Sequence, residues 1–274
     1  MFKTLSTMTS ALAVLFTAFA AFPQSNTPQV YSTAIYVRVA PEKEAAFIEF
    51  YKTGAGAKVA RARMKADPDA IGWSLRRAIY AGDPAPSANF VIIAAGNGAP
   101  KDPDPVKRDE LYRAASNMSY AEYMQKVRSM SEQIGQTISH VHHRTENYVT
   151  VEGDIVVATR LKAAEGKVRE LSDFEKDFRF PAAAARVQDG KAKGWSYSHN
   201  SFPGSSLRYD ATEAAVYKDM ASAMQINTGT AMAAFAKVFP GKDYARYVSD
   251  RRDLSKVVRT DVYRVMVSHR PEGH

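Results

Sequence analysis

The tripeptide Gly72-Trp73-Ser74 returns as Gly194-Trp195-Ser196, 122 residues later, and the two copies hold the only tryptophans of the chain. An arginine precedes both copies at the same spacing. Arg38 lies 35 residues before the first tryptophan, and Arg160 lies 35 residues before the second. Each arginine stands in a run of β-branched residues, which is typical of a strand. Chance would scatter such markers, so their common spacing indicates that a whole unit of sequence is present twice.

A second marker extends the repeat towards the end of each half. The pattern Arg-Thr-acid-x-Tyr occurs at residues 144–148 and again at residues 259–263. A chain of 274 residues is long enough for two domains that each bury a core of their own. We therefore predict one domain at residues 30–150 and a second at residues 151–270.

Each half reads in the same order: strand, helix, strand, strand, helix, strand. In the first half, residues 32–39 alternate as a strand does, and Pro41 then opens a helix that Gly54-Ala55-Gly56 interrupts. In the second half, Pro181 interrupts the corresponding helix. This β-α-β-β-α-β order is the ferredoxin-like arrangement, an antiparallel sheet with both helices on one face. The sequence therefore predicts an α+β protein made of two tandem ferredoxin-like repeats.

A sheet that is covered on one face must bury or use its other face. By element order, length and duplication, the chain resembles the dimeric α+β barrel superfamily. That superfamily includes small monooxygenases, stress-responsive A/B barrel proteins and haem-binding chlorite-dismutase-like proteins. The resemblance covers most of residues 30–270. It implies two antiparallel sheets packed face to face as an α+β barrel, and it does not single out one activity.

The N-terminus predicts export. Lys3 precedes an apolar run at residues 11–22, and small residues follow at Ala18-Phe19-Ala20, where a signal peptidase needs them. The run is shorter than the roughly 20 residues that span a bilayer. We therefore predict a signal peptide at residues 1–22, a periplasmic or secreted protein and no stable membrane anchor.

Composition excludes several kinds of chemistry. The chain has no cysteine, so disulfides, thiolate catalysis and iron–sulfur clusters are excluded. A formal net charge of +8 favours anionic ligands. The basic residues are spread along the chain without a dense cluster or a nucleic-acid motif, so we do not expect nucleic acid as a partner.

Strand parity selects candidates for a site. Tyr36 and Arg38 share one face of the first strand, and Arg160 takes the place of Arg38 in the second copy. We expect this face to line the barrel interior. A buried guanidinium needs partners, so either an acid or an anionic ligand should pair with each arginine. The alternative is a structural salt bridge or an exposed strand end.

The last strand of each half carries a polar row. In the second copy the row is Arg259, Asp261 and Tyr263, and an arginine and an acid two residues apart on a strand can pair, which is a structural role. The first copy places Arg144 in the same row and adds His140 and His142, which the second copy lacks. Because this histidine pair follows a duplication and is not shared, it is where a specialised site is expected.

Two imidazoles at i and i+2 can bind one metal ion, with His199 as a third ligand from the other half. They can equally serve as acid–base groups, form a polar lining or lie on a strand surface. No family-specific spacing selects among these. The cofactor is therefore left open, with haem or a histidine-bound metal among the options, and no catalytic residue is assigned.

These observations predict an exported protein that binds a small anionic or aromatic molecule in a basic, histidine-containing pocket between the two sheets. One alternative is a monooxygenase-like or haem-dependent oxidoreductase; another is a non-catalytic periplasmic interaction module. Oligomeric state is left open. The residues expected to line the pocket are Tyr36, Arg38, His140, His142, Arg144, Arg160, His199 and Arg259.

Overall fold

The computed structural model describes residues 29–271, except 82–87, 102, 147, 202–207, 226 and 227. The predicted signal peptide lies outside the described residues, so export stays a prediction. Within the described residues, no helix is long and apolar enough to cross a membrane.

The first half supplies four strands with helices between them. Its elements are β1 (Val30–Val39), α1 (Glu44–Lys52), α2 (Ala55–Ala66), β2 (Ala70–Ala81), β3 (Phe90–Asn97), α3 (Pro105–Ser116), α4 (Tyr120–Met130) and β4 (Ser131–Arg144).

The second half repeats this order. Its elements are β5 (Ile155–Ala163), α5 (Val168–Phe174), a π-helical turn (Glu175–Arg179), α6 (Phe180–Gln188), β6 (Gly194–Asn200), β7 (Ala211–Tyr217), α7 (Met220–Met224), α8 (Thr228–Val238), α9 (Tyr244–Leu254) and β8 (Ser255–His269).

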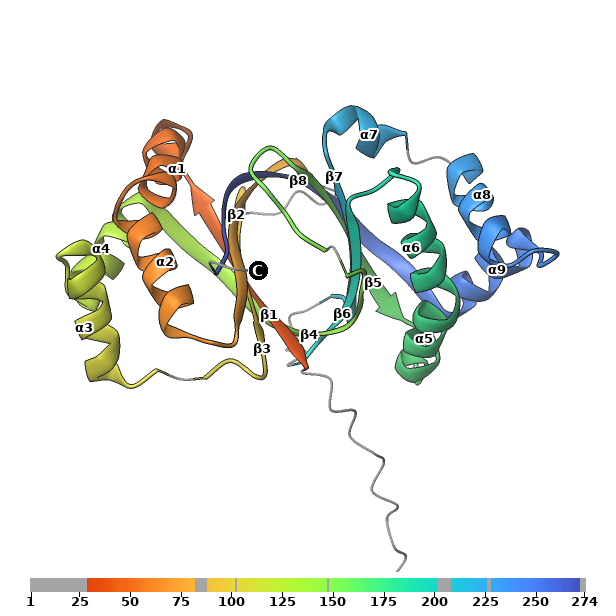
Figure 1. Cartoon of the computed structure of the whole chain (residues 1–274), viewed down its shortest axis with the longest axis horizontal. Helices are drawn as coiled ribbons and strands as arrows, with labels where there is room; N and C mark the ends of the chain where they lie inside the picture. Colours follow the sequence, from red (N-terminus) through yellow and green to blue (C-terminus); the bar gives the residue numbers. More distant parts are fainter. Residues whose placement is uncertain are drawn as a thin grey trace, which may run out of the picture.

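The eight strands form one closed barrel in the order β1-β3-β2-β8-β5-β7-β6-β4. Each half contributes four neighbouring strands, and antiparallel pairs β2–β8 and β4–β6 join the halves. Closure leaves no unpaired sheet edge. The helices of the two halves cover opposite outer sides of the barrel (Figure 1). The predicted fold class, two ferredoxin-like repeats closed into an α+β barrel, is confirmed.

The strands pack differently on their two faces. Inside the barrel, Ala34, Val156 and Val265 belong to one buried apolar cluster, with Tyr36 packed against it. On the outer face, alternate residues such as Val37 pack against the helices. The strand parity predicted for β1 and β5 is therefore confirmed.

The predicted interruption of the first helix is confirmed in the first half only. In the first half, α1 ends before Gly54 and α2 begins after it. A Cβ at Gly54 would lie 3.0 Å from Cα of Phe50, and one at Gly56 would lie 2.6 Å from Cδ1 of Tyr51, so close packing requires glycine at both positions. In the second half, the break predicted at Pro181 is not present: α5, the π-helical turn and α6 follow one another without a gap, and Pro181 lies in the first turn of α6, where proline is tolerated.

Two elements differ from the sequence prediction. The polar row predicts a last strand of the first half over about residues 137–151, whereas β4 begins at Ser131 and ends at Arg144. The prolines and glycines of residues 96–105 predict a loop, whereas a helix, α3, begins at Pro105. The Asp104 side chain accepts hydrogen bonds from the backbone N–H groups of Val106 and Lys107. The capping signal lay in a proline-rich stretch that reads as a loop.

Candidate functional site

Arg160 lies inside the barrel, as predicted, and the structure supplies its partners. Its guanidinium donates to the hydroxyls of Thr212 at 2.7 Å and Tyr36 at 3.1 Å. It also lies over the ring of Tyr209 and 3.6 Å from a carboxylate oxygen of Asp261. An acid and three hydroxyl-bearing side chains therefore surround this buried arginine, although its Nε has no hydrogen-bond partner among the described residues.

The Arg-acid-Tyr row of the second copy has the predicted structural role. Arg259 lies 2.9 Å from Oδ1 of Asp261, and the hydroxyl of Tyr263 donates to Oδ2 at 3.3 Å. Asp261 is fully buried. The carboxylate thus joins two arginines and a tyrosine on the inner face of β8.

Arg38 and Arg144 do not lie in a pocket. Arg38 is exposed at the end of β1, where it pairs with Glu132 at 3.1 Å. Arg144 is exposed at the last residue of β4. Both positions are ends of strands, so their side chains reach water although strand parity points them towards the interior.

The three histidines lie on the outer face of the barrel, not between the sheets. His140 stands opposite Tyr31 on β1 and opposite His199 on β6. Tyr31 has the parity of the helix-facing residues, so His140 and His199 face outward too. A register shift in β4, opposite Tyr36 and Val37, changes the alternation along this strand. The sequence contains no signal for this bulge, so the alternation of inward-facing and outward-facing residues could not be followed correctly along β4.

The outward-facing histidines form a cluster. The ring centroids of His140 and His142 are 4.4 Å apart, and those of His142 and His199 are 4.5 Å apart. Tyr31 stacks on His140 at 5.0 Å. A second register shift leaves His142 as the extra residue between Val141 and His143. Bulges often redirect a side chain beside a functional site, and this one places His142 against His199.

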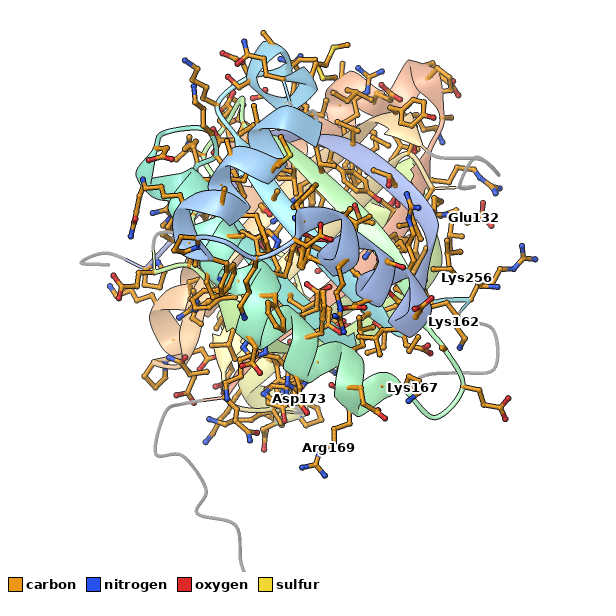
Figure 2. The ribbon with its side chains drawn as sticks, turned by 90° about the vertical axis from the view of Figure 1, so that its right-hand side faces the viewer. Glu132, Lys162, Lys167, Arg169, Asp173 and Lys256 are labelled. Carbon is orange, nitrogen blue, oxygen red and sulfur yellow. The ribbon has the colours of Figure 1, made fainter. Side chains whose placement is uncertain are left out.

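This cluster borders an open groove between the sheet and α5. We call it the histidine groove; it is lined by His142, Gly166, Val168, Arg169, Ser172, Asp173 and His199. Figure 2 shows Arg169 and Asp173 near the lower edge of the molecule, with the Arg169 side chain extending into solvent. A positive and a negative side chain therefore flank the entrance beside the exposed His142, while the half-buried His199 lies deeper.

His199 is held from beneath by a tyrosine. The hydroxyl of Tyr197 lies 2.6 Å from Nε2 of His199, and Tyr197 is fully buried. Burial lowers the pKa of His199 to about 4. Burial and then the neighbouring imidazoles lower the pKa of His142 as well, and burial lowers that of His140. All three imidazoles are therefore neutral at pH 7 and offer hydrogen-bonding nitrogens.

No protein-family model and no curated protein matches the chain. Solved structures do match. A candidate monooxygenase from Fusobacterium nucleatum superposes with a TM-score of 0.56 at 11% identity, over 90% of this chain and 96% of that one. A candidate monooxygenase from Lactobacillus acidophilus gives 0.52 at 9% identity, over 89% and 96%. An anthrone oxidase-like protein gives 0.51 at 13% identity, over 91% and 95%. The chain has the dimeric α+β barrel fold. At these identities the likeness shows the fold alone.

Some proteins of the dimeric α+β barrel superfamily bind haem, and the lining of the histidine groove shows whether haem fits there. A haem site needs a deep, largely apolar slot around an axial ligand. The histidine groove is open, and Val168 is the only aliphatic side chain among its described lining residues. These residues do not fit haem. Among the described residues of the α+β barrel, no group of three or more His, Asp or Glu side chains is placed to hold a metal ion.

The α+β barrel thus divides the predicted site between two places. Tyr36, Arg160 and Arg259 belong to the barrel interior. His142 and His199 line the histidine groove, and His140 packs on His142 beside it. Sequence reasoning missed the groove residues of α5 and the support from Tyr197. Tyr197 shares parity with His199 two residues later, and this signal could have linked them.

Proposed function

We propose that this α+β barrel protein is exported and binds a small molecule in the histidine groove. The observation that carries the proposal is the hydrogen bond at the floor of the groove, where the hydroxyl of Tyr197 lies 2.6 Å from Nε2 of His199. A fully buried tyrosine that fixes an imidazole beside an open groove supports a role in ligand contact.

The lining favours a molecule that is partly aromatic and carries a hydrogen-bond acceptor. The rings of His142 and His199 offer flat surfaces, and Ser172 adds a hydroxyl group. Arg169 supplies positive charge at the entrance and Asp173 supplies negative charge. Both are exposed and hence screened by solvent, so the half-buried imidazole of His199 should decide what binds.

A second candidate is an oxidoreductase that works on the same kind of ligand. Two structures with this fold are candidate monooxygenases, and a tyrosine–histidine pair is a suitable device for holding an oxygen atom of a substrate. The groove would then bind the substrate, and His199 would contact the oxygen on which negative charge develops.

The test is a ligand-observed NMR screen of small aromatic acids, amides and amines against the full chain. We expect a member of the set to bind, and a His142→Ala/His199→Ala variant to lose that binding. His269→Ala is the matched control, because His269 is a half-buried imidazole that packs on Trp73, away from the groove lining. Equal binding by the double variant and the native chain would contradict the proposal.

Export has a separate test. Expression of the full chain in a Gram-negative host, followed by intact-mass measurement of the periplasmic fraction, should recover a protein that lacks about the first 22 residues. Recovery of the uncleaved chain from the cytoplasm would contradict export and leave the groove proposal standing.

A further inference from the structure

The duplication provides an internal control for the groove. By the 122-residue offset of the Gly-Trp-Ser copies, Tyr197 corresponds to Leu75 and His199 corresponds to Arg77. Leu75 is fully buried in the apolar core of the first half. Arg77 forms an ion pair with Glu44. The tyrosine–histidine pair therefore exists in the second half alone.

Polar groups also lie behind Tyr197 in the second half. Oε1 of Glu213 accepts from Nε1 of Trp195 at 2.7 Å and from Nε of Arg179 at 2.6 Å, and Oε2 accepts from Arg251 at 2.7 Å. Arg251 also donates to Glu175 at 3.0 Å. Glu175 is fully buried and Glu213 nearly so. We call Glu175, Arg179, Glu213 and Arg251 the ionic quartet.

The first half has apolar residues at the places that match Glu213 and Arg251. Trp195 pairs with Ala215 on β7, and Trp73 pairs with Ala94 on β3, so Glu213 matches Ile92. The pattern Tyr-Ala-x-Tyr also occurs in both halves, at residues 120–123 and 244–247. Val127 lies seven residues after the start of the first copy, and Arg251 lies seven residues after the start of the second, so Arg251 matches Val127. Ile92 and Val127 both pack in the apolar cluster of the first half.

The fold therefore does not need the ionic quartet. Removing an ion from water costs several kcal/mol, and an apolar replacement of a buried ion network is often neutral or stabilising. The first half uses such a packing in the same element order. The second half nevertheless keeps two carboxylates and two guanidiniums. Their role is therefore to hold in position the layer that they support, which contains Trp195 and Tyr197.

The hydrogen bond between Tyr197 and His199 has a determinable direction. Burial, followed by the nearby carboxylate of Glu175, raises the pKa of Tyr197, so the hydroxyl keeps its proton. Among the described residues, His199 is the only hydrogen-bond partner of this fully buried hydroxyl. Donation to Nε2 satisfies the hydroxyl, whereas the reverse direction would leave a buried proton without an acceptor. His199 then carries its own proton on Nδ1.

We infer that Tyr197, positioned by the layer above the ionic quartet, fixes His199 as an Nδ1–H donor, and that the groove takes its ligand through an acceptor oxygen such as a carboxylate or phenolate. This inference rests on the proposed function. It deepens that function by naming the ligand class and by assigning Tyr197 as a positioning residue that contacts the ligand only through His199.

The test combines the tautomer of His199 with a matched ligand series. Long-range ¹H–¹⁵N NMR of the full chain at pH 7 should show Nδ1 of His199 protonated and Nε2 unprotonated. Benzoate should perturb the His199 signals at lower concentration than benzamide, and benzylamine should be weakest. Tyr197→Phe should abolish the single-tautomer pattern and weaken benzoate binding about tenfold, the effect of one hydrogen bond of about 1.4 kcal/mol.

Tyr36→Phe is the control, because it removes a hydroxyl from the barrel interior and leaves the groove unchanged. It should retain both the tautomer and the binding of benzoate. Protonation of Nε2 in the native chain would overturn the inference. The proposed function would still stand if His142→Ala/His199→Ala loses ligand binding. Preferred binding of benzylamine would overturn the ligand class. If the tautomer is as expected and no probe of the wider screen binds, the proposed function itself fails.

Discussion

The indole N–H of Trp195 donates to the buried carboxylate of Glu213, whereas its counterpart Trp73 stacks on His269 with ring centroids 5.6 Å apart. The same repeated tripeptide therefore supports a polar layer in one half and an aromatic layer in the other. This difference separates what builds the barrel from what builds the groove.

The first prediction concerns the charge of Glu213. Burial alone would raise the pKa of Glu213, but Arg179 and Arg251 lower it to about 2, so the carboxylate is ionised and paired at pH 7. Glu213→Gln leaves these arginines without their shared counter-charge and should lower the free energy of unfolding by about 3 kcal/mol. Urea denaturation measures this loss of unfolding free energy. Glu132→Gln, at the exposed pair with Arg38, is the control and should cost under about 1 kcal/mol. Equal costs would contradict the prediction.

The second prediction concerns the barrel interior. Asp261→Asn removes the carboxylate that faces buried Arg160 and should cost about 3 kcal/mol in the free energy of unfolding, because an uncompensated charge stays inside. Adding Arg160→Met should recover part of that loss. A double variant less stable than Asp261→Asn alone would show that Arg160 stabilises the barrel through packing or its hydroxyl partners instead of through this pair.

The third prediction concerns pH. An unfolded histidine has a pKa of about 6.5, whereas that of folded His199 is about 4, so the unfolded chain binds the proton first as pH falls. The stabilising contribution of neutral His199 is complete above pH 7 and is lost between about pH 6.5 and pH 4. Thermal unfolding across this range should show a falling midpoint, and His199→Asn should fall less steeply. Parallel curves for the two proteins would argue against the burial of this imidazole.

The fourth prediction concerns the helix break of the first half. A Cβ at Gly56 would lie 2.6–2.8 Å from ring atoms of Tyr51 and Phe50, both of them buried. Gly56→Ala should therefore cost about 1–3 kcal/mol in the free energy of unfolding, the usual cost of overpacking. Gly135→Ala is the control, because a Cβ there meets no atom within 4 Å. Similar denaturation midpoints for the two variants would contradict this account of the break.

Local spacing predicted the two repeats and their element order, and the resemblance to the dimeric α+β barrel superfamily implied that they close into a barrel. The Trp copies fix the repeat. Ser119 and Glu122 have the spacing that predicts a capping box, and this box is present at the start of α4. The histidine site was misplaced because parity depends on the register with neighbouring strands. The bulge near Gly135 and the one at His142 are products of pairing in three dimensions, and no local residue pattern marks them.

The ionic quartet was also outside the reach of local patterns. Glu213 is the only charged residue of β7 and shares parity with apolar outer-face residues, which is a signal that could have been followed. Its partners come from the π-helical turn and from α9, so only the tertiary fold brings them together. By contrast, the row Arg259-Asp261-Tyr263 lies within one strand, and its pairing was predicted correctly.

A crystal structure of the full chain soaked with benzoate tests the central claim most directly. The account predicts density for the carboxylate within hydrogen-bonding distance of Nδ1 of His199, with the ring between the strands and α5. Benzoate in the barrel interior against Arg160, with an empty histidine groove, would contradict it.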